Sequence, residues 1–459
     1  MSSYLASLFQ RNDINWKAIG ALFLVANYAF KTYLNYREYN VTLHPKPPVV
    51  VEKEITQEQF VKSQNYTRDH LKFSLIRDTS ELVKELAILY FNLLPQIWGL
   101  AGKVGSYLGG VKLFSGIFGG VTLQSVLFFA IKKTLELIYV IPRSYYFDFF
   151  IEEKWGFNKQ TRSKFFRDSL LQIVVVQAFH AAATFIFVKI VDFFGGDFAK
   201  YASVAFLVGL LFIQTVVPTV ILPLFHKFTP LRDGELRIKI EELAKKNGFP
   251  VKKLLEVDGS STSSHSNAFF TGLPWNKQIV LFDTLIEQHT TEEIVAVLAH
   301  ELGHWKLGHI WQITALIAAL VSGNFLLFTA AFESTPLAVS FGFTGASPIV
   351  NLVLFSYLSW PVDFSFQIFH NIVTRKNEYQ ADNYALKQGY KDELASGLIR
   401  MNQKNLSSLD TDWLNSLCTI SHPNLVERLQ AIGYDPKEKV GNLPEKDRII
   451  NNEKEETRG

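Results

Sequence analysis

Cysteine is almost absent from this chain, which has 459 residues and a single cysteine, Cys418. One cysteine cannot form an intramolecular disulfide, and it cannot supply the cysteine cluster that holds a structural zinc ion. Any zinc site must therefore be built mainly from histidine and carboxylate side chains.

Strong charge of either sign is also missing. The chain has 46 Lys and Arg against 43 Asp and Glu, a formal net charge of +3. No long basic stretch interleaved with aromatic residues occurs, although such a stretch is typical of proteins that bind nucleic acid. We therefore expect no nucleic-acid partner.

Apolar residues are abundant instead. Hydrophobic residues make up 48% of the chain and aromatic residues 14%, with 39 Phe, and the mean hydropathy is +0.11. These values are high for a soluble protein of several domains. The composition predicts a protein that crosses a lipid bilayer.

Seven apolar stretches approach the roughly 20 helical residues that a hydrocarbon core requires. Lys17 and Lys31 flank the first, which lacks a small-residue cleavage site, so a retained anchor is favoured over a signal peptide. Residues 134–150 either extend the third helix or lie at the membrane interface. The seven stretches cover residues 18–34, 82–100, 114–131, 170–188, 204–225, 310–332 and 349–369.

Charge between these stretches predicts their orientation, because short cytosolic loops are rich in Lys and Arg. The loops after the first and third stretches carry many Lys and Arg, whereas those after the second, fourth and sixth carry few. Seven crossings then place the N-terminus in the lumen. Residues 226–309 and the C-terminal tail are expected in the cytosol.

The segment between the fifth and sixth stretches predicts a small α+β insert. Glu235–Lys246 has the pattern of an amphipathic helix, and residues 254–258 and 278–282 that of short strands. Between those strands, residues 267–271 could form an edge strand to which an extended peptide can add. An ordinary Asn/Gly turn is the alternative for this segment.

Residues 300–304 read His-Glu-Leu-Gly-His, an H-E-x-x-H motif. Thr290 and Glu293 predict a capping box that starts a helix through the motif. On that helix His300 and His304 share one face and can bind Zn²⁺ together, while Glu301 can act as the general base.

A catalytic zinc ion needs a third protein ligand. His309 follows His304 by five residues, which on one continuous helix turns it about 140° away from the metal side. Glu378 and Asp382 are better candidates, because a spacing of four places both on one helical face. One of them can bind the metal while the other orients a ligating histidine, and a solvated acidic pair is the alternative.

Five blocks of the sequence together resemble the integral-membrane CAAX prenyl protease family of eukaryotes. Members of this family are zinc metalloproteases that process farnesylated proteins such as the a-type mating pheromone and prelamin A. The blocks are residues 151–161, 266–272, 300–304, 377–382 and 421–429.

The resemblance implies that His300, His304 and Glu378 bind one Zn²⁺ and that Glu301 is the general base. It also implies that Asp382, His422 and Arg428 lie near the metal, where His422 or Arg428 would help to stabilise the oxyanion. The expected substrate strand consists of Asn267, Ala268, Phe269, Phe270 and Thr271.

The expected fold is an all-α polytopic membrane protein whose seven helices enclose a large chamber, with a small α+β zincin-like catalytic insert. The expected activity removes the last three residues of prenylated CAAX proteins, with a second cleavage in a farnesylated precursor. The expected location is the endoplasmic reticulum membrane, with the inner nuclear membrane as a second location. The expected divisions are residues 1–225, 226–309, 310–369, 370–447 and a disordered tail at 448–459.

Two other functions remain open from the residues alone. A quality-control protease of membrane proteins would use the same zinc ligands but would not require a prenylated substrate. The sequence contains no motif that is known to recognise a prenyl group. A receptor or transporter with seven helices could instead use the His/Glu cluster as an ion site.

Overall fold

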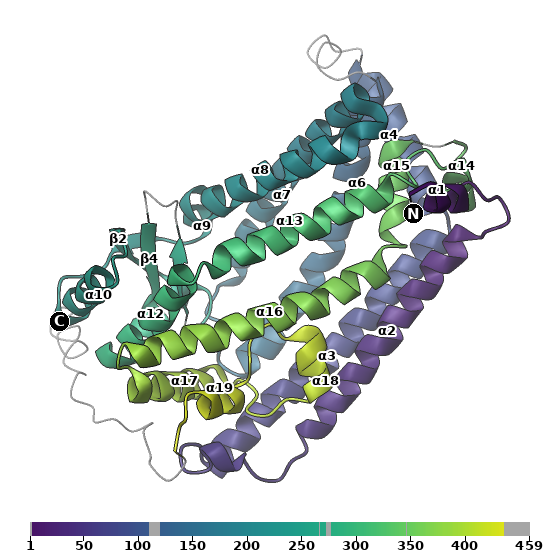
Figure 1. Ribbon diagram of the computed structural model, residues 1–459. Coiled ribbons are helices and arrows are strands. Elements are labelled where there is room, and N and C mark those ends of the chain that lie inside the picture. Colours follow the sequence, from purple (N-terminus) through teal and green to yellow (C-terminus); the bar gives the residue numbers. More distant parts are fainter. Residues whose placement is uncertain (1, 110–119, 266, 272–276, 346, 436–459) are drawn as a thin grey trace.

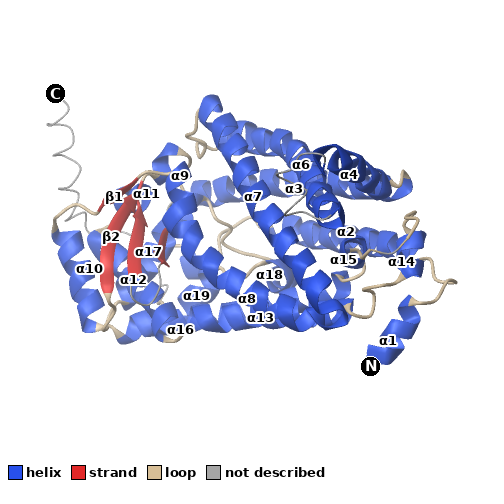
Figure 2. Cartoon of the chain, turned by 90° about the horizontal axis from the view of Figure 1, so that it is seen from above, coloured by secondary structure: helices blue, strands red, loops and turns tan. Residues whose placement is uncertain are grey.

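The computed structural model describes residues 2–109, 120–265, 267–271, 277–345 and 347–435. Long helices extend over most of the molecule, and a small sheet lies among shorter helices at one end (Figure 1). The view from above likewise gathers the strands at one end, with the N-terminus at the other (Figure 2). The fold is thus mostly helical with one small sheet, and the predicted tail at 448–459 lies outside the described residues.

The helices of the first half include several of more than 25 residues. They are α1 (Ser2–Phe9), α2 (Trp16–Val41), α3 (Gln57–Tyr90), α4 (Leu93–Gly109), α6 (Gly120–Tyr146), α7 (Arg162–Phe194), α8 (Phe198–Val216) and α9 (Leu222–Phe225). A π-helical turn, Phe147–Glu152, continues α6.

The helices of the second half are mostly shorter. They are α10 (Glu235–Lys246), α11 (Asp283–Gln288), α12 (Thr291–Lys306), α13 (His309–Phe328), α14 (Thr335–Ser340), α15 (Pro348–Ser356), α16 (Trp360–Lys387), α17 (Lys391–Asn405), α18 (Trp413–Thr419) and α19 (Leu425–Ala431).

Among the described residues, two helical segments are long and apolar enough to cross a membrane. They are Arg162–Phe225, which contains α7 and α8, and α13. A third span results if α15 and α16 count as one, although they are bent by 60° relative to each other. These segments are those of a membrane protein. The count of seven spans stays a prediction.

Two of the predicted stretches are not single helices. The second, residues 82–100, is broken because Asn92 has a φ of +50°, a left-handed conformation that asparagine tolerates better than most residues. Pro95 is not the cause, since it lies in the first turn of α4, where a missing N–H is tolerated. The seventh stretch, residues 349–369, is broken between α15 and α16.

The third predicted stretch begins among residues 110–119, which lie outside the described part of the chain. From Gly120 onward it is helical, and α6 runs on to Tyr146. Residues 134–150 are therefore helical and continue the third helix.

The sheet has four strands in the order β1–β2–β4–β3. β2 (Val251–Val257) and β4 (Lys277–Phe282) are the two predicted strands and pair in parallel. β3 (Ala268–Thr271) pairs antiparallel with β4 and lies at the edge of the sheet. β1 (Phe228–Pro230), at the other edge, was not predicted from the sequence.

The sheet, α10, α12, α17 and α19 share one hydrophobic core, which we call the catalytic end. Val51, Ile55 and Phe60, from the segment before and at the start of α3, are part of this core. The Tyr434 hydroxyl also donates to the Glu54 carboxylate at 2.8 Å. Residues far apart in the sequence thus build the catalytic end, which the sequence pattern did not indicate.

Candidate metal centre

Helix α12 carries the His-Glu-Leu-Gly-His motif into the core of the catalytic end. The predicted capping box stabilises its first turn. The Thr290 hydroxyl accepts a hydrogen bond from the Glu293 backbone N–H, and the Glu293 carboxylate accepts one from the Thr290 backbone N–H. Gly303 permits close approach of α16, because a Cβ on it would lie 2.9 Å from the Ala381 Cα. Side chains of both helices can therefore share one site.

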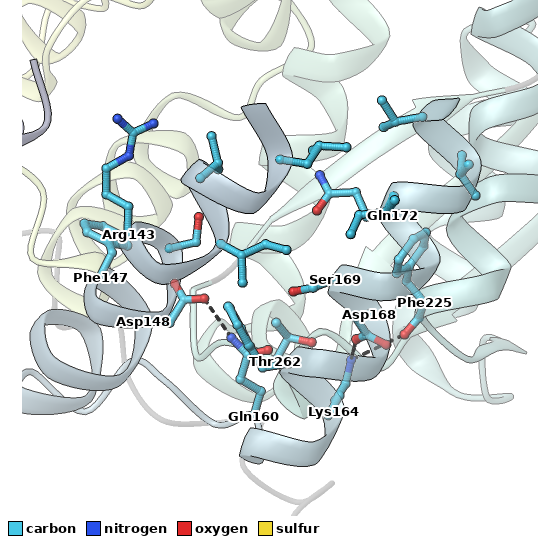
Figure 3. A pocket seen from close by; sticks show the side chains of 18 of the residues that line it. Arg143, Phe147, Asp148, Gln160, Lys164, Asp168, Ser169, Gln172, Phe225 and Thr262 are labelled. Carbon is cyan, nitrogen blue, oxygen red and sulfur yellow. Dashed lines mark hydrogen bonds and ion pairs between the residues drawn. The ribbon is translucent and has the colours of Figure 1, made fainter. Parts of the chain in front are cut away.

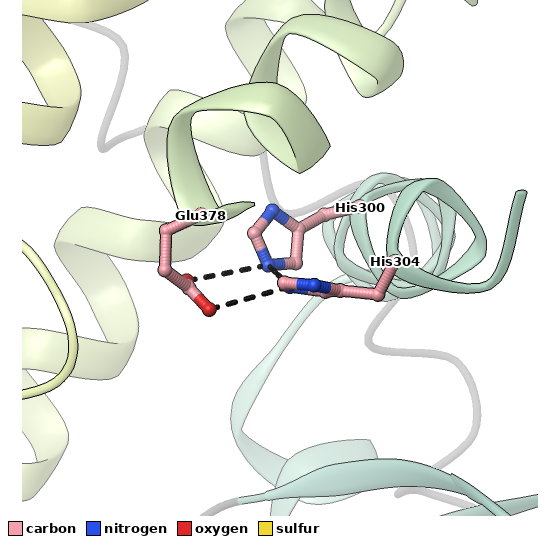
Figure 4. A group of neighbouring side chains, drawn as sticks. All are labelled: His300, His304 and Glu378. Carbon is pink, nitrogen blue, oxygen red and sulfur yellow. Dashed lines mark hydrogen bonds and ion pairs between the residues drawn. The ribbon is translucent and has the colours of Figure 1, made fainter. Parts of the chain in front are cut away.

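Three side chains meet between these helices: His300 and His304 from α12, and Glu378 from α16 (Figure 4). One possible ligand atom from each lies within 4.8 Å of the others. The two histidine Nε2 atoms are 3.1 Å apart. The Glu378 carboxylate oxygens lie 3.6 Å from the His300 Nε2 and 3.3 Å from the His304 Nε2. Two imidazoles and one carboxylate form a ligand set found in catalytic zinc sites.

Asp382 holds His300 from the side opposite to Glu378. Its Oδ1 lies 2.8 Å from the His300 Nδ1, and Asp382 is only 1% exposed. Arg428, from α19, donates to both Asp382 oxygens, at 2.9 and 2.6 Å. A carboxylate in this position fixes the tautomer and the orientation of a ligating histidine. Asp382 and Arg428 therefore lie beside the cluster, behind His300.

His309 contacts His304 in a similar way, and sequence reasoning missed this contact. The chain leaves α12 through Gly308, whose φ is +72°, so His309 does not continue the helix as the 140° argument assumed. Its Nδ1 lies 2.9 Å from the His304 Nδ1, and its Nε2 lies 3.0 Å from the Gln380 Oε1. The only signal in the sequence was the glycine between the two helices.

His422 and Glu301 lie where the cluster is more accessible. The His422 Nε2 is 3.3 Å from the Glu378 Oε1, and its side chain is 67% exposed. Glu301 follows His300 on α12 and is half-buried. The Arg428 side chain, by contrast, is only 14% exposed and already forms hydrogen bonds with Asp382. His422 and Glu301 are therefore better placed than Arg428 to contact a ligand.

The carboxylate of Glu378 makes the site favourable for positive charge. Burial lowers the pKa of His304, but the hydrogen bond with Glu378 and its negative charge outweigh burial, so that the pKa is raised. A site that stabilises a proton on a ligating histidine also attracts a metal cation, which competes with that proton.

The edge strand β3 contacts α12 directly. Its inner side pairs with β4, and within the described residues no strand pairs with its outer side. Ala268 is buried and Asn267 is exposed. The predicted strand at residues 267–271 is thus observed over β3, and the helix that carries the metal cluster lies next to it.

A cavity of about 860 Å³ lies away from this cluster, between α3, α6, α7 and residues 221–226 (Figure 3). Apolar and polar side chains both line it, and the pairs Asp148 with Gln160 and Lys164 with Asp168 lie within it. It also reaches Thr262, in the loop before β3. None of His300, His304 and Glu378 lines it, so size alone does not identify the reactive site.

Comparison with known proteins shows similarity over nearly the whole chain. CAAX prenyl protease 1 of Saccharomyces cerevisiae is 39% identical over 95% of this chain and 99% of the relative. The CAAX prenyl protease 1 homolog of Homo sapiens is 33% identical over 90% of this chain and 94% of the relative. The family model described as CAAX prenyl protease N-terminal, five membrane helices, matches residues 36–227, and that of peptidase family M48 matches residues 230–435.

The chain belongs to the CAAX prenyl proteases of peptidase family M48. The crystal structure of S. mikatae Ste24p resembles this M48 fold with a TM-score of 0.87 and 39% sequence identity, and the match covers 92% of this chain and all of that one. The protein is therefore a membrane metalloprotease. The alternative hypothesis, a receptor or transporter, is wrong.

The residues of the M48 site fit a metal ion. His300, His304 and Glu378 direct possible ligand atoms toward one another, and the negative charge of the Glu378 carboxylate stabilises a cation placed between them. The Nδ1 of His300 is occupied by Asp382, which leaves its Nε2 for a metal. Nitrogen and carboxylate ligands are compatible with zinc.

Proposed function

We propose that the protein is a zinc-dependent endopeptidase of the endoplasmic reticulum membrane that removes the last three residues of prenylated CAAX proteins and makes a second cleavage in a farnesylated precursor. The observation that carries this proposal is the His300–His304–Glu378 cluster on a helix that contacts an edge strand and leads, through Gly308, into the apolar helix α13. A lipid-modified peptide can then keep its lipid in an apolar environment while its backbone reaches the metal ligands.

His300, His304 and Glu378 would hold the zinc ion, and Asp382, with Arg428, would keep His300 in the correct tautomer. When bound, Zn²⁺ supplies a Lewis acid for the scissile carbonyl. Glu301 takes the proton of the attacking water and returns it to the nitrogen of the leaving amine. His422, exposed beside Glu378, stabilises the negative charge that develops on the carbonyl oxygen.

Residues Asn267, Ala268, Phe269, Phe270 and Thr271 are the proposed substrate strand. An extended peptide would pair antiparallel with the outer side of β3 through main-chain hydrogen bonds. Its direction then places the C-terminal residues of the substrate toward Asn267 and the prenylated cysteine toward Thr271. Asn267→Ala should raise KM or lower kcat and leave zinc content unchanged.

The proposed topology has seven spans around a chamber, a luminal N-terminus, and a cytosolic metal site and C-terminus, in the endoplasmic reticulum and the continuous inner nuclear membrane. The proposed divisions are residues 1–225, 226–309, 310–369, 370–447 and 448–459. A glycosylation acceptor inserted near residue 195 or 340 should be modified, and one near residue 240 should not. Modification near residue 240 would contradict the cytosolic location of the insert.

The substrate proposal is tested by a farnesylated CAAX peptide and its unmodified twin in the same detergent, with Glu301→Gln as the inactive control. We expect kcat/KM to be much higher for the farnesylated peptide, and cleavage of both peptides to fall by about 10²- to 10⁴-fold in the control. Equal values for the two peptides would contradict prenyl selectivity and favour the quality-control function.

A further inference from the structure

A buried carboxylate lies in the block of residues 151–161, which carries part of the family resemblance but takes no part in the chemistry above. Glu152, in the π-helical turn after α6, is 8% exposed. Its Oε1 accepts from the Tyr66 hydroxyl at 2.9 Å and lies 2.9 Å from the His70 Nε2. Its Oε2 lies 3.2 Å from the His265 Nε2. Both oxygens of this carboxylate therefore have polar partners.

The charge of Glu152 is maintained by these contacts. Burial alone raises the pKa of a carboxylate, but the hydrogen bonds with His265, His70 and Tyr66 outweigh burial and lower the pKa of Glu152 to about 2. A buried charge without such partners would be strongly unfavourable. Glu152 thus remains an acceptor for all three neighbours at neutral pH.

The three neighbours come from two different parts of the molecule. Tyr66 and His70 lie on α3, the helix of 34 residues that leads away from the catalytic end. His265 lies in the loop that enters β3, with Asn267 two residues later and β3 beginning at Ala268. Glu152 therefore joins α3 to the start of the edge strand.

The backbone around Glu152 reinforces this junction. Residues 157–159 run antiparallel to residues 262–264: the Lys159 N–H donates to the Thr262 carbonyl at 3.0 Å, and the Ser264 N–H donates to the Phe157 carbonyl at 3.1 Å. The Phe157 ring also stacks on the His265 ring at 4.1 Å between centroids. The loop before β3 is thus held by the segment that carries Glu152.

Hydrogen bonds fix the backbone between His265 and β3. Its carbonyl accepts from the Thr284 hydroxyl at 2.9 Å, and the Asn267 carbonyl accepts from the Phe282 N–H at 3.1 Å. Only Ser266 separates His265 from Asn267, so a shift of His265 must move the start of the strand. Displacement of a binding strand weakens the main-chain hydrogen bonds that hold an added peptide, and so weakens substrate binding.

We propose that Glu152 is a positioning residue that, through Tyr66, His70 and His265, holds the edge strand β3 in register for substrate beside the metal cluster. The proposal rests on the proposed function, because β3 is the proposed substrate strand. Glu152 touches neither the metal ligands nor the substrate, and it acts through the loop at residues 262–265.

The test uses the full-length protein in detergent, with Glu152→Gln as the variant and Glu153→Gln as the control, since Glu153 is the exposed residue that follows Glu152. Gln keeps the shape of Glu but can accept with only one of its two terminal atoms. For Glu152→Gln we expect unchanged zinc content, kcat within about twofold and KM raised about tenfold, as for loss of uniform substrate binding. Glu153→Gln should match the original protein.

Two further variants cover a failure of Glu152→Gln to fold. Glu152→Asp keeps the charge and should give an intermediate KM, and Tyr66→Phe removes one donor and should raise KM by about two- to threefold. If kcat, zinc content and thermal stability fall together in all three variants, the residue has a general structural role and the proposal is wrong. Unchanged KM in all three would also overturn it.

Hydrogen exchange separates this proposal from the proposed function. Amides of residues 268–271 should exchange faster in Glu152→Gln than in Glu153→Gln, whether or not the protein cleaves a farnesylated peptide. If the original protein does not cleave that peptide, the proposed function fails, and exchange alone decides whether Glu152 holds β3. Identical exchange in the two variants would overturn the positioning role while leaving the peptidase function intact.

Discussion

Helix α12 and the helix pair α7–α8 use apolar residues in opposite ways. Eleven of the 16 residues of α12 are buried, whereas only four of the 33 residues of α7 and three of the 19 of α8 are buried. Large side chains of the pair lie on the surface, among them Leu170 at 64%, Val204 at 63% and Phe193 at 82% exposure. The catalytic end packs its apolar side chains against each other, while α7 and α8 leave many of theirs exposed, as apolar helices that cross a hydrocarbon core can.

Buried polar groups show the same contrast. In the catalytic end Glu293 is fully buried, yet it pairs with Arg400 at 3.0 Å and with the Ser396 hydroxyl at 2.6 Å. Gln214 of α8, by contrast, makes one hydrogen bond to Thr314 of α13, at 3.0 Å. Substitutions should therefore have different effects in the catalytic end and in the pair α7–α8.

The largest expected difference concerns chemistry. Glu301→Gln should keep zinc and lower kcat by about 10²- to 10⁴-fold, because the general base is lost. His304→Ala should lose zinc and activity together. His180→Ala, an exposed histidine on α7, is the control and should change neither, as measured by metal analysis with a peptidase assay. Near-normal turnover of Glu301→Gln, or full zinc in His304→Ala, would contradict the assigned roles.

The next largest expected difference is the loss of stability when a leucine is shortened in each region. Leu298 of α12 is fully buried, and Leu298→Ala should lower the free energy of unfolding by about 2–5 kcal/mol through the cavity it leaves. Leu170→Ala on α7 should lower it by less than about 1 kcal/mol, because lipid or detergent replaces the lost contacts. Unfolding followed in detergent compares the two. Equal losses would mean that Leu170 is covered by protein and not by lipid.

A smaller effect is expected behind the metal ligands. Asp382→Asn removes the charge that faces Arg428 and weakens the support of His300, so zinc affinity should fall by about 10- to 100-fold. Asp363→Asn is the control, since Asp363 lies 19 residues earlier in α16, roughly 28 Å along the helix, and pairs there with Ser359 and Asn324. Competition with a chelator measures both affinities. A similar loss in the two variants would exclude a specific role for Asp382.

The smallest expected effect comes from one methyl group. Gly303→Ala should lower the free energy of unfolding by about 1 kcal/mol, because the new Cβ would meet the Ala381 backbone at 2.9 Å. Gly323→Ala in α13 has nothing within 4 Å and should be neutral or slightly stabilising, since alanine favours the helix. Thermal unfolding of both variants is the measurement. A stabilised Gly303→Ala would show that α12 and α16 can move apart freely.

Local patterns in the sequence determined the start of α12, the common face of His300 and His304, and the helix that carries Glu378 and Asp382. These features depend on caps and on the 3.6-residue helical period, which act between residues close in the chain. The amphipathic α10 and the strands β2, β3 and β4 were also indicated by local spacing. The breaks at Asn92 and before α16 were not, because composition identifies an apolar stretch but not where its backbone turns.

The spacing of Glu378 and Asp382 predicted one supporting side chain, but the contacts between distant segments were decided by the tertiary structure. Arg428 reaches His300 across 128 residues of sequence, His265 reaches Glu152 across 113, and Val51 and Ile55 enter the core of the catalytic end. Such contacts are set by the joint packing of many helices and strands, to which each residue contributes weakly, so no short pattern specifies them. The sequence could place the ligands and Asp382 on their helices, but the contacts that Arg428, His309 and His422 make with the cluster depend on how the helices pack.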